Sequence, residues 1–408
     1  MAEIFSLVRR AVADQLPAGE PFRAVLDDTL LRRSGLHTPG TGWRRDPLGP
    51  HFQTNFVRAQ RFQQVSAVMP GQDGTFRAVP ITFLHVPTAP KPKPKATEKE
   101  LAQYRLDVLN FRLSVRAVQQ MIQLRESLDQ DPGGKERILI LAFDGGYTNA
   151  TVLKKIPHRT ICIGRIRKDA NLCFTPDPAL MKARGRRLRY GPPAPTPEQL
   201  RTDESEPWQT MTFQHRGLTH ELSYKRRQNI MWRTAGAEQI LQLVVIKPLA
   251  YRNRKGGRLQ YRDPAFLICT DPTLDVREVI EAYFQRWDVE VNFREEKTLL
   301  GVGQAQVRAT ASVESVPALT VAAYGMLLVS AQQAFGNSTA ALLPPPNWAT
   351  TQGPRTSTQQ LLHQLRAEVW GRGLGIQSFT GFASNPTTET KPEKCNFPLA
   401  SAVCYANG

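Results

Sequence analysis

Two apolar segments that each end in an acid constrain the fold of this chain most strongly. The segment RILILAFD at 137–144 is continuously apolar, as a central strand of a sheet is, and FRAVLDD at 22–28 has the same character. Central strands of α/β proteins carry functional side chains at their carboxyl ends. The sequence therefore predicts an α/β protein with aspartates at the functional edge of its sheet. Because aspartates also cap loops at strand ends, neither segment assigns a function alone.

A third acid stands out in the segment YFQRWDVEVNFREEK at 283–297. As one helix, with about 100° per residue, this segment gathers four side chains within an arc of about 60°: Tyr283, Arg286, Glu290 and Lys297. The other three acids of the segment point away from the arc, which singles out Glu290. Arg286 lies four residues before Glu290, so an ordinary intrahelical ion pair is the better explanation when the segment is taken alone.

The positive charge of the chain is concentrated in one region. Of a net charge of +17, residues 151–262 carry +15, with 23 Lys and Arg against 8 Asp and Glu. Strand-like runs alternate with basic loops over 159–271, which predicts a β-rich insertion. A basic surface of this kind attracts a polyanion, most commonly nucleic acid. The alternative is a protein that is merely basic.

The acids and the basic region together favour phosphodiester chemistry. Carboxylates are costly to hold close together unless a cation compensates their charge. Two strand-end aspartates and a helix-borne glutamate form a hard-oxygen set that suits two Mg²⁺ ions. Such ions activate an attacking oxygen and stabilise the leaving oxygen during in-line attack on a phosphodiester.

At these residues the chain resembles a known family. The pattern Y-x2-R-x3-E-x6-K, matched by 283–297, resembles the YREK signature of insertion-sequence DDE transposases. DDTLLRRSG resembles the block around the first catalytic aspartate and points to Asp28, with Asp27 the less favoured candidate. FDGGYTN resembles the second block and points to Asp144, and Glu290 is the third acid. The resemblance covers roughly residues 20–310.

This resemblance implies an RNase H-like fold, a mixed sheet with flanking helices interrupted by a β-rich insertion between the second aspartate and the glutamate. It implies that Asp28, Asp144 and Glu290 are catalytic and bind two Mg²⁺, for which Mn²⁺ can substitute. Four further side chains would hold phosphates: Tyr283, Arg286, Lys297 and Arg294. The implied activity is cleavage and strand transfer at the ends of an insertion sequence. The partners are double-stranded DNA, at element ends and target, and a second copy in a homodimer.

The expected organisation has four parts. Residues 1–150 begin the catalytic domain, 151–272 form the basic insertion, 273–375 complete the catalytic domain, and 376–408 are a poorly ordered tail. Family members usually carry a sizeable DNA-binding region before the first aspartate, whereas 27 residues precede Asp28 here. A non-catalytic DNA-binding remnant and a stand-alone RNase H-like nuclease therefore remain alternatives.

Three features of the sequence predict where in the cell the protein resides. The amino-terminal segment is amphipathic and carries acids, unlike a signal peptide. The five cysteines are scattered without metal-ligand spacing, as in a reducing compartment. The apolar segment at 316–331 contains Pro and Thr and is short for a membrane span, which favours a buried helix. We expect a cytoplasmic, nucleoid-associated protein that does not bind membranes.

Overall fold

The structure is a computed structural model of the chain. It describes residues 1–35, 37–46, 49–50, 52–71, 75–177, 188–215, 218–236, 239–252, 254, 256–336 and 355–373. The tail predicted at 376–408 lies outside these residues.

The strands form one large sheet and a small ribbon. The large sheet contains β1 (Phe22–Arg32), β2 (Gly42–Arg45), β3 (Phe56–Pro70), β4 (Phe76–His85), β5 (Leu139–Phe143), β6 (Thr160–Arg165), β7 (Leu172–Phe174), β8 (Gln209–His215), β9 (Leu218–Trp232), β10 (Leu241–Ile246) and β13 (Ala265–Cys269). Its strand order is β2-β3-β1-β5-β6-β13-β10-β9-β7, with β4 beside β3 and β8 beside β9. The ribbon pairs β11 (Ala250–Tyr251) with β12 (Gln260–Tyr261).

The centre of the large sheet is parallel. β1 pairs with β5, and β5 pairs with β6, both in parallel, whereas β3 pairs with β1 in the antiparallel direction. All five residues of β5 are buried, which explains why its sequence is continuously apolar. This mixed sheet with flanking helices agrees with the predicted α/β class and is compatible with an RNase H-like fold.

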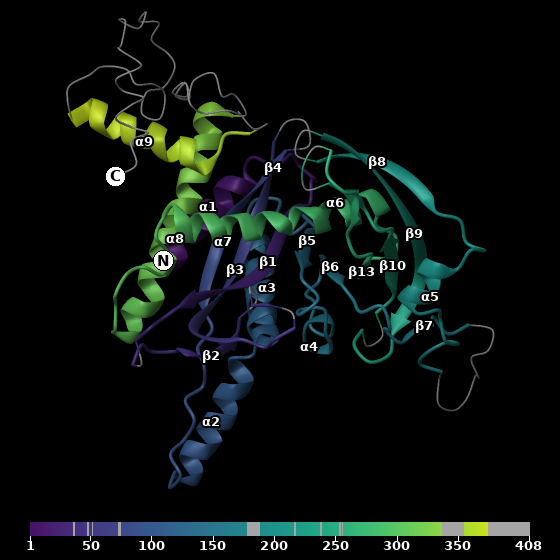
Figure 1. The fold of residues 1–408 in the computed structure, drawn as a ribbon, viewed down its shortest axis with the longest axis horizontal. Coiled ribbons are helices and arrows are strands. Elements are labelled where there is room, and N and C mark those ends of the chain that lie inside the picture. The colour runs from purple at the N-terminus through teal and green to yellow at the C-terminus, as the bar shows by residue number, and fades with distance from the viewer. Residues whose placement is uncertain are drawn as a thin grey trace, which may run out of the picture.

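Helices cover both faces of the sheet (Figure 1). They are α1 (Ala2–Ala13), α2 (Glu98–Asn110), α3 (Leu113–Asp129), α4 (Ala150–Leu153), α5 (Pro197–Thr202), α6 (Val276–Gln285), α7 (Trp287–Thr298), α8 (Thr310–Phe335) and α9 (Thr358–Gly373). Side chains of α1, α3 and α8 pack in one apolar cluster with Leu26 and Leu141. Side chains of α7 pack on the opposite face with Val25 and Ala142.

The range predicted as an insertion continues the central sheet. β6 extends the parallel centre, and β13, β10, β9 and β7 follow it by antiparallel pairing. Strand pairing therefore joins the basic region to the strand that precedes Asp144. The division of the chain into domains stays a prediction.

Two helix predictions differ in detail from the structure. The segment 283–297 is divided between α6 and α7, with a turn at Arg286, although Arg286 keeps right-handed helical dihedral angles and the helical phase is nearly preserved. The apolar segment at 316–331 lies within α8, which is long and apolar enough by composition to cross a membrane. Half of its most apolar window is buried inside the protein, because it packs against α1 and β4.

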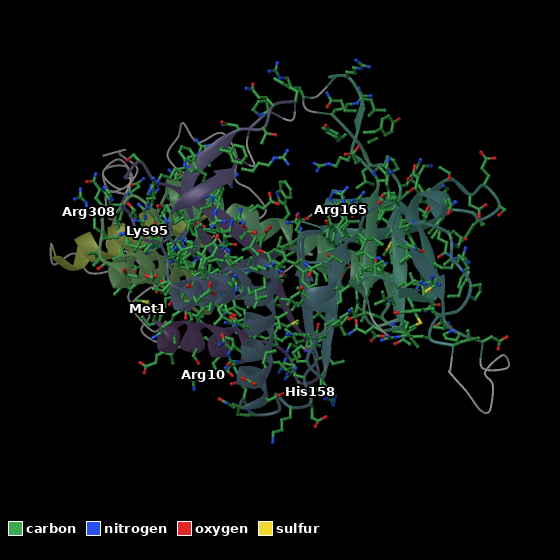
Figure 2. The ribbon with its side chains drawn as sticks, turned by 90° about the horizontal axis from the view of Figure 1, so that it is seen from below. Met1, Arg10, Lys95, His158, Arg165 and Arg308 are labelled. Atoms are coloured by element: carbon green, nitrogen blue, oxygen red, sulfur yellow. The ribbon has the colours of Figure 1, made fainter. Side chains whose placement is uncertain are left out.

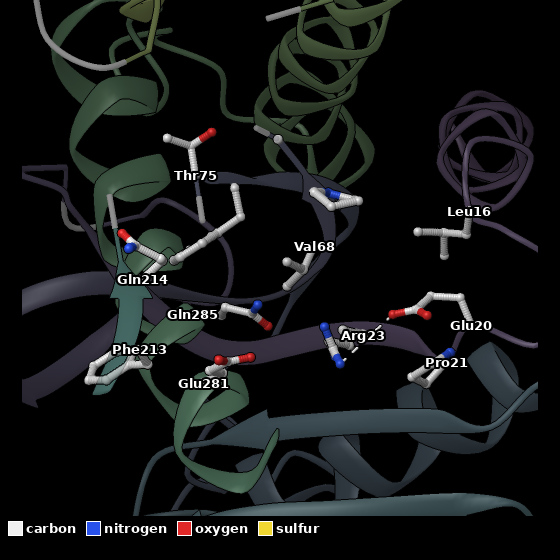
Figure 3. Close-up of a pocket in the computed structure, with 13 residues that line it drawn as sticks. Leu16, Glu20, Pro21, Arg23, Val68, Thr75, Phe213, Gln214, Glu281 and Gln285 are labelled. Carbon is white, nitrogen blue, oxygen red and sulfur yellow. Dashed lines mark ion pairs between the residues drawn. The ribbon is translucent and has the colours of Figure 1, made fainter. Parts of the chain in front are cut away.

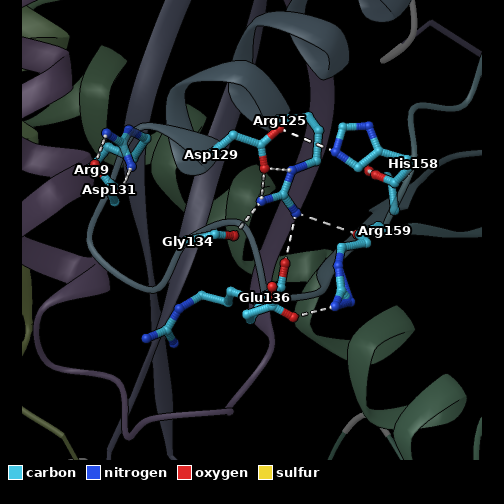
Figure 4. Close-up of polar contacts among 10 residues, drawn as sticks. Arg9, Arg125, Asp129, Asp131, Gly134, Glu136, His158 and Arg159 are labelled. Atoms are coloured by element: carbon cyan, nitrogen blue, oxygen red, sulfur yellow. Dashed lines mark hydrogen bonds and ion pairs between the residues drawn. The ribbon is translucent and has the colours of Figure 1, made fainter.

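One buried arginine fixes the loop that leads into β5 (Figure 4). Arg125 on α3 is 1% exposed. It donates hydrogen bonds to the carbonyl oxygens of Gly134 (2.7 Å) and Arg137 (2.8 Å), and it pairs with Asp129. A Cβ atom at Gly134 would approach the Leu128 carbonyl oxygen to 1.7 Å, so this tight loop needs glycine. The contacts hold the start of β5 in place, and β5 in turn positions Asp144.

Candidate active site

Strand alternation sends the two adjacent aspartates of β1 to opposite faces of the sheet. Val25 packs with Val289 and Phe293 of α7, and Asp27, two residues further along, lies on the same face. Leu26 packs in the cluster formed by α3, and Asp28 shares its face. We call these the Asp27 face, covered by α7, and the Asp28 face, covered by α3.

On the Asp27 face, one guanidinium joins two acids. The Arg286 Nη1 atom lies 3.0 Å from Asp27 Oδ2 and 3.2 Å from Glu290 Oε1. The intrahelical pair expected from sequence is therefore present, but the same arginine also reaches β1. Its Cζ atom lies 5.7 Å from the centre of the Tyr283 ring. Three residues of the predicted YREK pattern thus meet beside Asp27.

The fourth residue of the pattern contacts the same strand. Lys297 Nζ donates a hydrogen bond of 2.6 Å to Oγ1 of Thr29, which lies on the Asp27 face. Burial lowers the Lys297 pKa, and the neighbouring Glu296 opposes that shift. Arg294, by contrast, is exposed. Its side chain forms no hydrogen bond or ion pair with another described residue, and its backbone carbonyl accepts a hydrogen bond from the Thr298 hydroxyl.

Asp28 has a different set of partners. The Tyr147 hydroxyl donates a hydrogen bond of 2.7 Å to Asp28 Oδ1, and Arg61 Nε lies 3.4 Å from Oδ2. The sequence favours Asp28 as the partner of Glu290, yet in the structure Asp27 is the aspartate that shares Arg286 with Glu290. The physical reason is the strand's side-chain alternation, which a resemblance between short blocks does not resolve.

The position of Asp144 follows from the register between β1 and β5. Leu26 pairs with Phe143 in the parallel β1–β5 ladder. Extending this register by one residue places Asp144 beside Asp27, and neighbours in a parallel ladder point to the same face. Asp144 directly follows β5 and is exposed, and its charge acts on both Asp27 and Asp28 as well as on Arg286 and Tyr283. The sheet therefore brings Asp144 to the Asp27 side of β1.

The two β1 acids are both difficult to ionise. Burial raises the Asp27 pKa to about 7, Arg286 opposes the shift, and the negative charges of Asp28 and Asp144 add to it. Burial also raises the Asp28 pKa, against the opposing effects of Arg61 and Tyr147. Arg286 alone therefore does not offset the cost of a charged Asp27. A further cation at this edge would favour the ionised carboxylates.

The donor atoms suit a hard divalent cation, but they are not gathered as a finished metal site. Across the part of the chain that the structure describes, no three His, Cys, Asp or Glu side chains form a group that could hold a metal ion. Arg286 lies between Asp27 and Glu290 and pairs with both. Carboxylate oxygens at the end of a central sheet are the ligands that Mg²⁺ prefers.

The other acids of α7 point elsewhere, as the helical phase predicts. Asp288 is 2.9 Å from Arg355, a residue to which the sequence assigns no role. Glu295 accepts hydrogen bonds from Tyr324 (2.5 Å) and Thr358 (2.6 Å). Glu296 is buried. These contacts belong to the packing of α7 against α8 and the start of α9.

Cavities lined by described residues lie near the sheet, and three of them bear on the site. The first, of about 220 Å³, is lined by Arg23 and by Glu281 and Gln285 of α6 (Figure 3). It lies at the start of β1, where Arg23 is 3.9 Å from Glu20 and 3.8 Å from Glu278. It is therefore remote from the carboxylate site.

The other two cavities flank the turn that follows Asp144. One of about 980 Å³ is lined by Gly145 and by four cationic side chains, Arg165, Arg167, Lys168 and Arg201. The other, of about 510 Å³, is lined by Gly146 and lies on the Asp28 side. Arg165, the last residue of β6, lies near the middle of the molecule in the view from below (Figure 2). Sequence reasoning missed Arg61, Tyr147 and Arg165. Positive charge was the signal for the two arginines, and Tyr147 lies within the FDGGYTN segment.

The fold defines an α/β protein that carries carboxylates beside the parallel centre of its sheet. A family model described as DDE superfamily endonuclease matches residues 2–239. The chain belongs to this family, which implies a nuclease or transposase acting on DNA. The matched range contains Asp27, Asp28 and Asp144, whereas Glu290 lies beyond it. No curated protein matches the chain.

Proposed function

We propose that this chain is a Mg²⁺-dependent DDE transposase that cleaves DNA at the ends of an insertion sequence and transfers the freed strand to target DNA. The observation that carries the proposal is the shared arginine: Arg286 pairs with both Asp27 and Glu290 beside the strand that ends in Asp144. A family match to DDE endonucleases supports the same chemistry.

In this proposal Asp27, Asp144 and Glu290 are the metal ligands, with Asp27 in place of Asp28. Bound Mg²⁺ would activate the attacking oxygen and stabilise the leaving oxygen. Mn²⁺ would substitute for Mg²⁺, because it also binds carboxylate oxygens. Asp28 is a positioning residue that holds Tyr147 and Arg61.

The basic residues have separate tasks. Arg286 is placed to hold a phosphate once its carboxylate partners bind cations, because a planar guanidinium can donate two parallel hydrogen bonds. Lys297 supplies a point charge near Thr29. Tyr283 packs beside Arg286 and limits its movement. The positive region at 151–262 would hold the DNA backbone, and we expect the active complex to contain two copies of the chain.

The substitution Glu290→Gln tests the proposal. Measured on DNA bearing the element's terminal repeats, the variant should lose strand cleavage by at least about a hundredfold, as expected when a charge that stabilises the transition state is removed. DNA binding should stay close to that of the unchanged protein. Glu126→Gln, an exposed acid on α3, is the matched control and should cleave normally. Normal cleavage by Glu290→Gln would exclude this site.

Two alternatives have distinct outcomes in the same assay. A non-catalytic DNA-binding remnant would bind the terminal repeats without Mg²⁺-dependent nicking. A stand-alone nuclease would nick but would not join a freed 3′ end to a second DNA. A strand-transfer assay with labelled element ends therefore distinguishes all three activities.

A further inference from the structure

The cavity on the Asp28 side has an unusual lining. It lies between the end of β2, the segment that follows β4 and the junction of α2 with α3, and its volume is about 510 Å³. Among the described residues that line it, four are cationic and none is acidic: Arg44, Arg61, Lys91 and Arg112. Gly146, two residues after Asp144, forms part of its wall. We call it the Arg44–Arg61 cavity.

Two arginines of the cavity, Arg44 and Arg61, have Asp28 as the acid near them. Burial lowers the Arg44 pKa, the nearby charge of Arg61 lowers it further, and Asp28 opposes both effects. Arg44 Nη2 donates a hydrogen bond of 2.6 Å to Thr88. The Nε atoms of Arg44 and Arg61 are buried and make no hydrogen bond among the described residues, although Arg61 Nε lies 3.4 Å from Asp28 Oδ2 as an ion pair. Buried charged donors without a hydrogen bond destabilise the protein, and an anion bound in the cavity would accept those hydrogen bonds.

The larger cavity beside Gly145 differs in its charge balance. There Arg201 pairs with Glu198 at 2.6 Å, and Arg167 pairs with Asp169 at 2.8 Å. Half of its four cations are thus already neutralised by neighbours. In the Arg44–Arg61 cavity Arg61 pairs with Asp28, whereas Arg44, Lys91 and Arg112 form no ion pair among the described residues. The two cavities lie on either side of the Gly145–Gly146 turn, and the Arg44–Arg61 cavity has the greater number of unpaired cations.

Aromatic side chains complete the Arg44–Arg61 cavity. Tyr104 and Phe111, at the α2 side, are both half-buried and line it. The guanidinium of Arg116 lies 5.4 Å from the centre of the Phe111 ring and covers one of its faces. A volume within the range of about 300–1,000 Å³ fits a small ligand such as a nucleotide better than a duplex segment. Aromatic faces beside cationic groups are how proteins hold unpaired bases and their phosphates.

We propose that the Arg44–Arg61 cavity binds an unpaired nucleotide of a DNA strand that leaves the duplex next to the Asp144 edge. Arg44 and Arg61 hold its phosphate, and Tyr104 and Phe111 contact its base. Asp28 and Tyr147 orient Arg61 for this contact. The inference rests on the proposed function in taking DNA as the ligand, but it does not require catalysis.

The test uses the full chain with EDTA, so that no cleavage occurs. Binding is measured by fluorescence anisotropy for a blunt duplex and for the same duplex with a short single-stranded extension. The unchanged protein should bind the extended probe more tightly. Arg44→Gln and Tyr104→Leu should each reduce affinity for the extended probe by about tenfold, with a much smaller effect on the blunt duplex. Arg10→Ala, exposed on α1, is the control and should leave both affinities unchanged.

The salt dependence provides a second readout. Removing one phosphate contact should lower the slope of log affinity against log salt by about one for Arg44→Gln, but not for Tyr104→Leu. Thermal unfolding of each variant checks that the fold is kept. If Arg44→Gln does not fold, Lys91→Gln, which is exposed in the same lining, takes its place.

Two outcomes would overturn the proposal. Equal loss of affinity for both probes would mean that these side chains contact duplex phosphates only. No preference of the unchanged protein for the extended probe would mean that the cavity holds no unpaired nucleotide. Because the assay contains no metal, either result is distinct from failure of the proposed function, which is read from cleavage by the unchanged protein and by Glu290→Gln.

Discussion

The two faces of β1 carry adjacent aspartates in contrasting surroundings. On the Asp27 face, Asp27 and Glu290 share one arginine, and Asp144 lies at the same edge. On the Asp28 face, Asp28 accepts a hydrogen bond from Tyr147 and lies near Arg61. The first face concentrates negative charge, and the second borders a cavity rich in positive charge. Alternation along one strand therefore separates a candidate cation site from a candidate anion site.

The largest expected effect comes from removing the negative charge of each aspartate in turn. Asp27→Asn should reduce DNA cleavage by at least about a hundredfold, because it removes a proposed metal ligand. Asp28→Asn should have a smaller effect, of about tenfold to a hundredfold at most, as for residues that act through others. Cleavage rates at saturating Mg²⁺ measure both. The reverse order of effects would restore Asp28 as the ligand.

The helices that cover the two faces also differ in whether a buried ionisable side chain on them is fully paired. On α3, Arg125 is fully paired with carbonyls and Asp129. Arg125→Met should lower the free energy of unfolding by about 3 kcal/mol, because buried carbonyl oxygens and Asp129 lose their donor. Urea denaturation measures the change. Arg105→Met, exposed on α2, is the control, and an equally small effect of both variants would show that the network contributes little.

On α7, Glu296 is 1% exposed and one of its oxygens has no hydrogen-bond partner among the described residues. Burial raises its pKa from 4.5 to about 8 and outweighs the opposing effects of Gln64 and Lys297. The folded protein therefore holds the proton that the unfolded chain releases. The contribution of this group is fully present below about pH 4.5 and is lost as pH rises through about 8.

Glu296→Gln removes this titration. The free energy of unfolding of the unchanged protein should decline between about pH 4.5 and about pH 8, by about 1.4 kcal/mol per pH unit from this group. The variant should show a flatter profile and greater stability at the alkaline end. Urea denaturation across this range gives the comparison, and parallel profiles of the two proteins would contradict the assigned protonation.

The smallest effect on DNA cleavage is expected for Arg294, which lies outside both faces of β1. Arg294 is exposed, and its side chain contacts neither aspartate through a hydrogen bond or ion pair. Arg294→Ala should leave cleavage at saturating DNA unchanged and lower the salt slope of DNA binding by about one if it contacts a phosphate. Binding titrations at several salt concentrations measure the slope. A large loss of cleavage would place Arg294 in the site with Arg286.

Much of the site could be predicted from local patterns. Continuous apolar runs predicted β1 and β5, and Asp144 directly follows β5 as predicted. β1, however, continues through Asp27 and Asp28 to Arg32, so the prediction that it ends at these aspartates was wrong. Helical phase predicted that Glu290 and Arg286 share a side while Asp288 points elsewhere. These predictions succeed because hydrophobic periodicity depends on nearby residues. The turn at Arg286 left the phase almost intact.

The choice between Asp27 and Asp28 needed the tertiary structure. In a strand with apolar side chains on both faces, alternation does not show which face meets a given helix. That depends on the β1–β5 register and on the packing of Val289 and Phe293 against Val25. The continuation of the sheet through 151–272 likewise depends on pairing between distant segments.

By itself, the sequence determined the α/β class, the acids available for chemistry and the basic character of the region after Asp144, because composition and local periodicity encode them. Only the tertiary structure decided that Arg286 joins Asp27 to Glu290, that Asp28 turns to Tyr147 and Arg61, and that a cationic cavity forms beside Gly146. Those contacts join residues far apart in the chain, and long-range packing sets them.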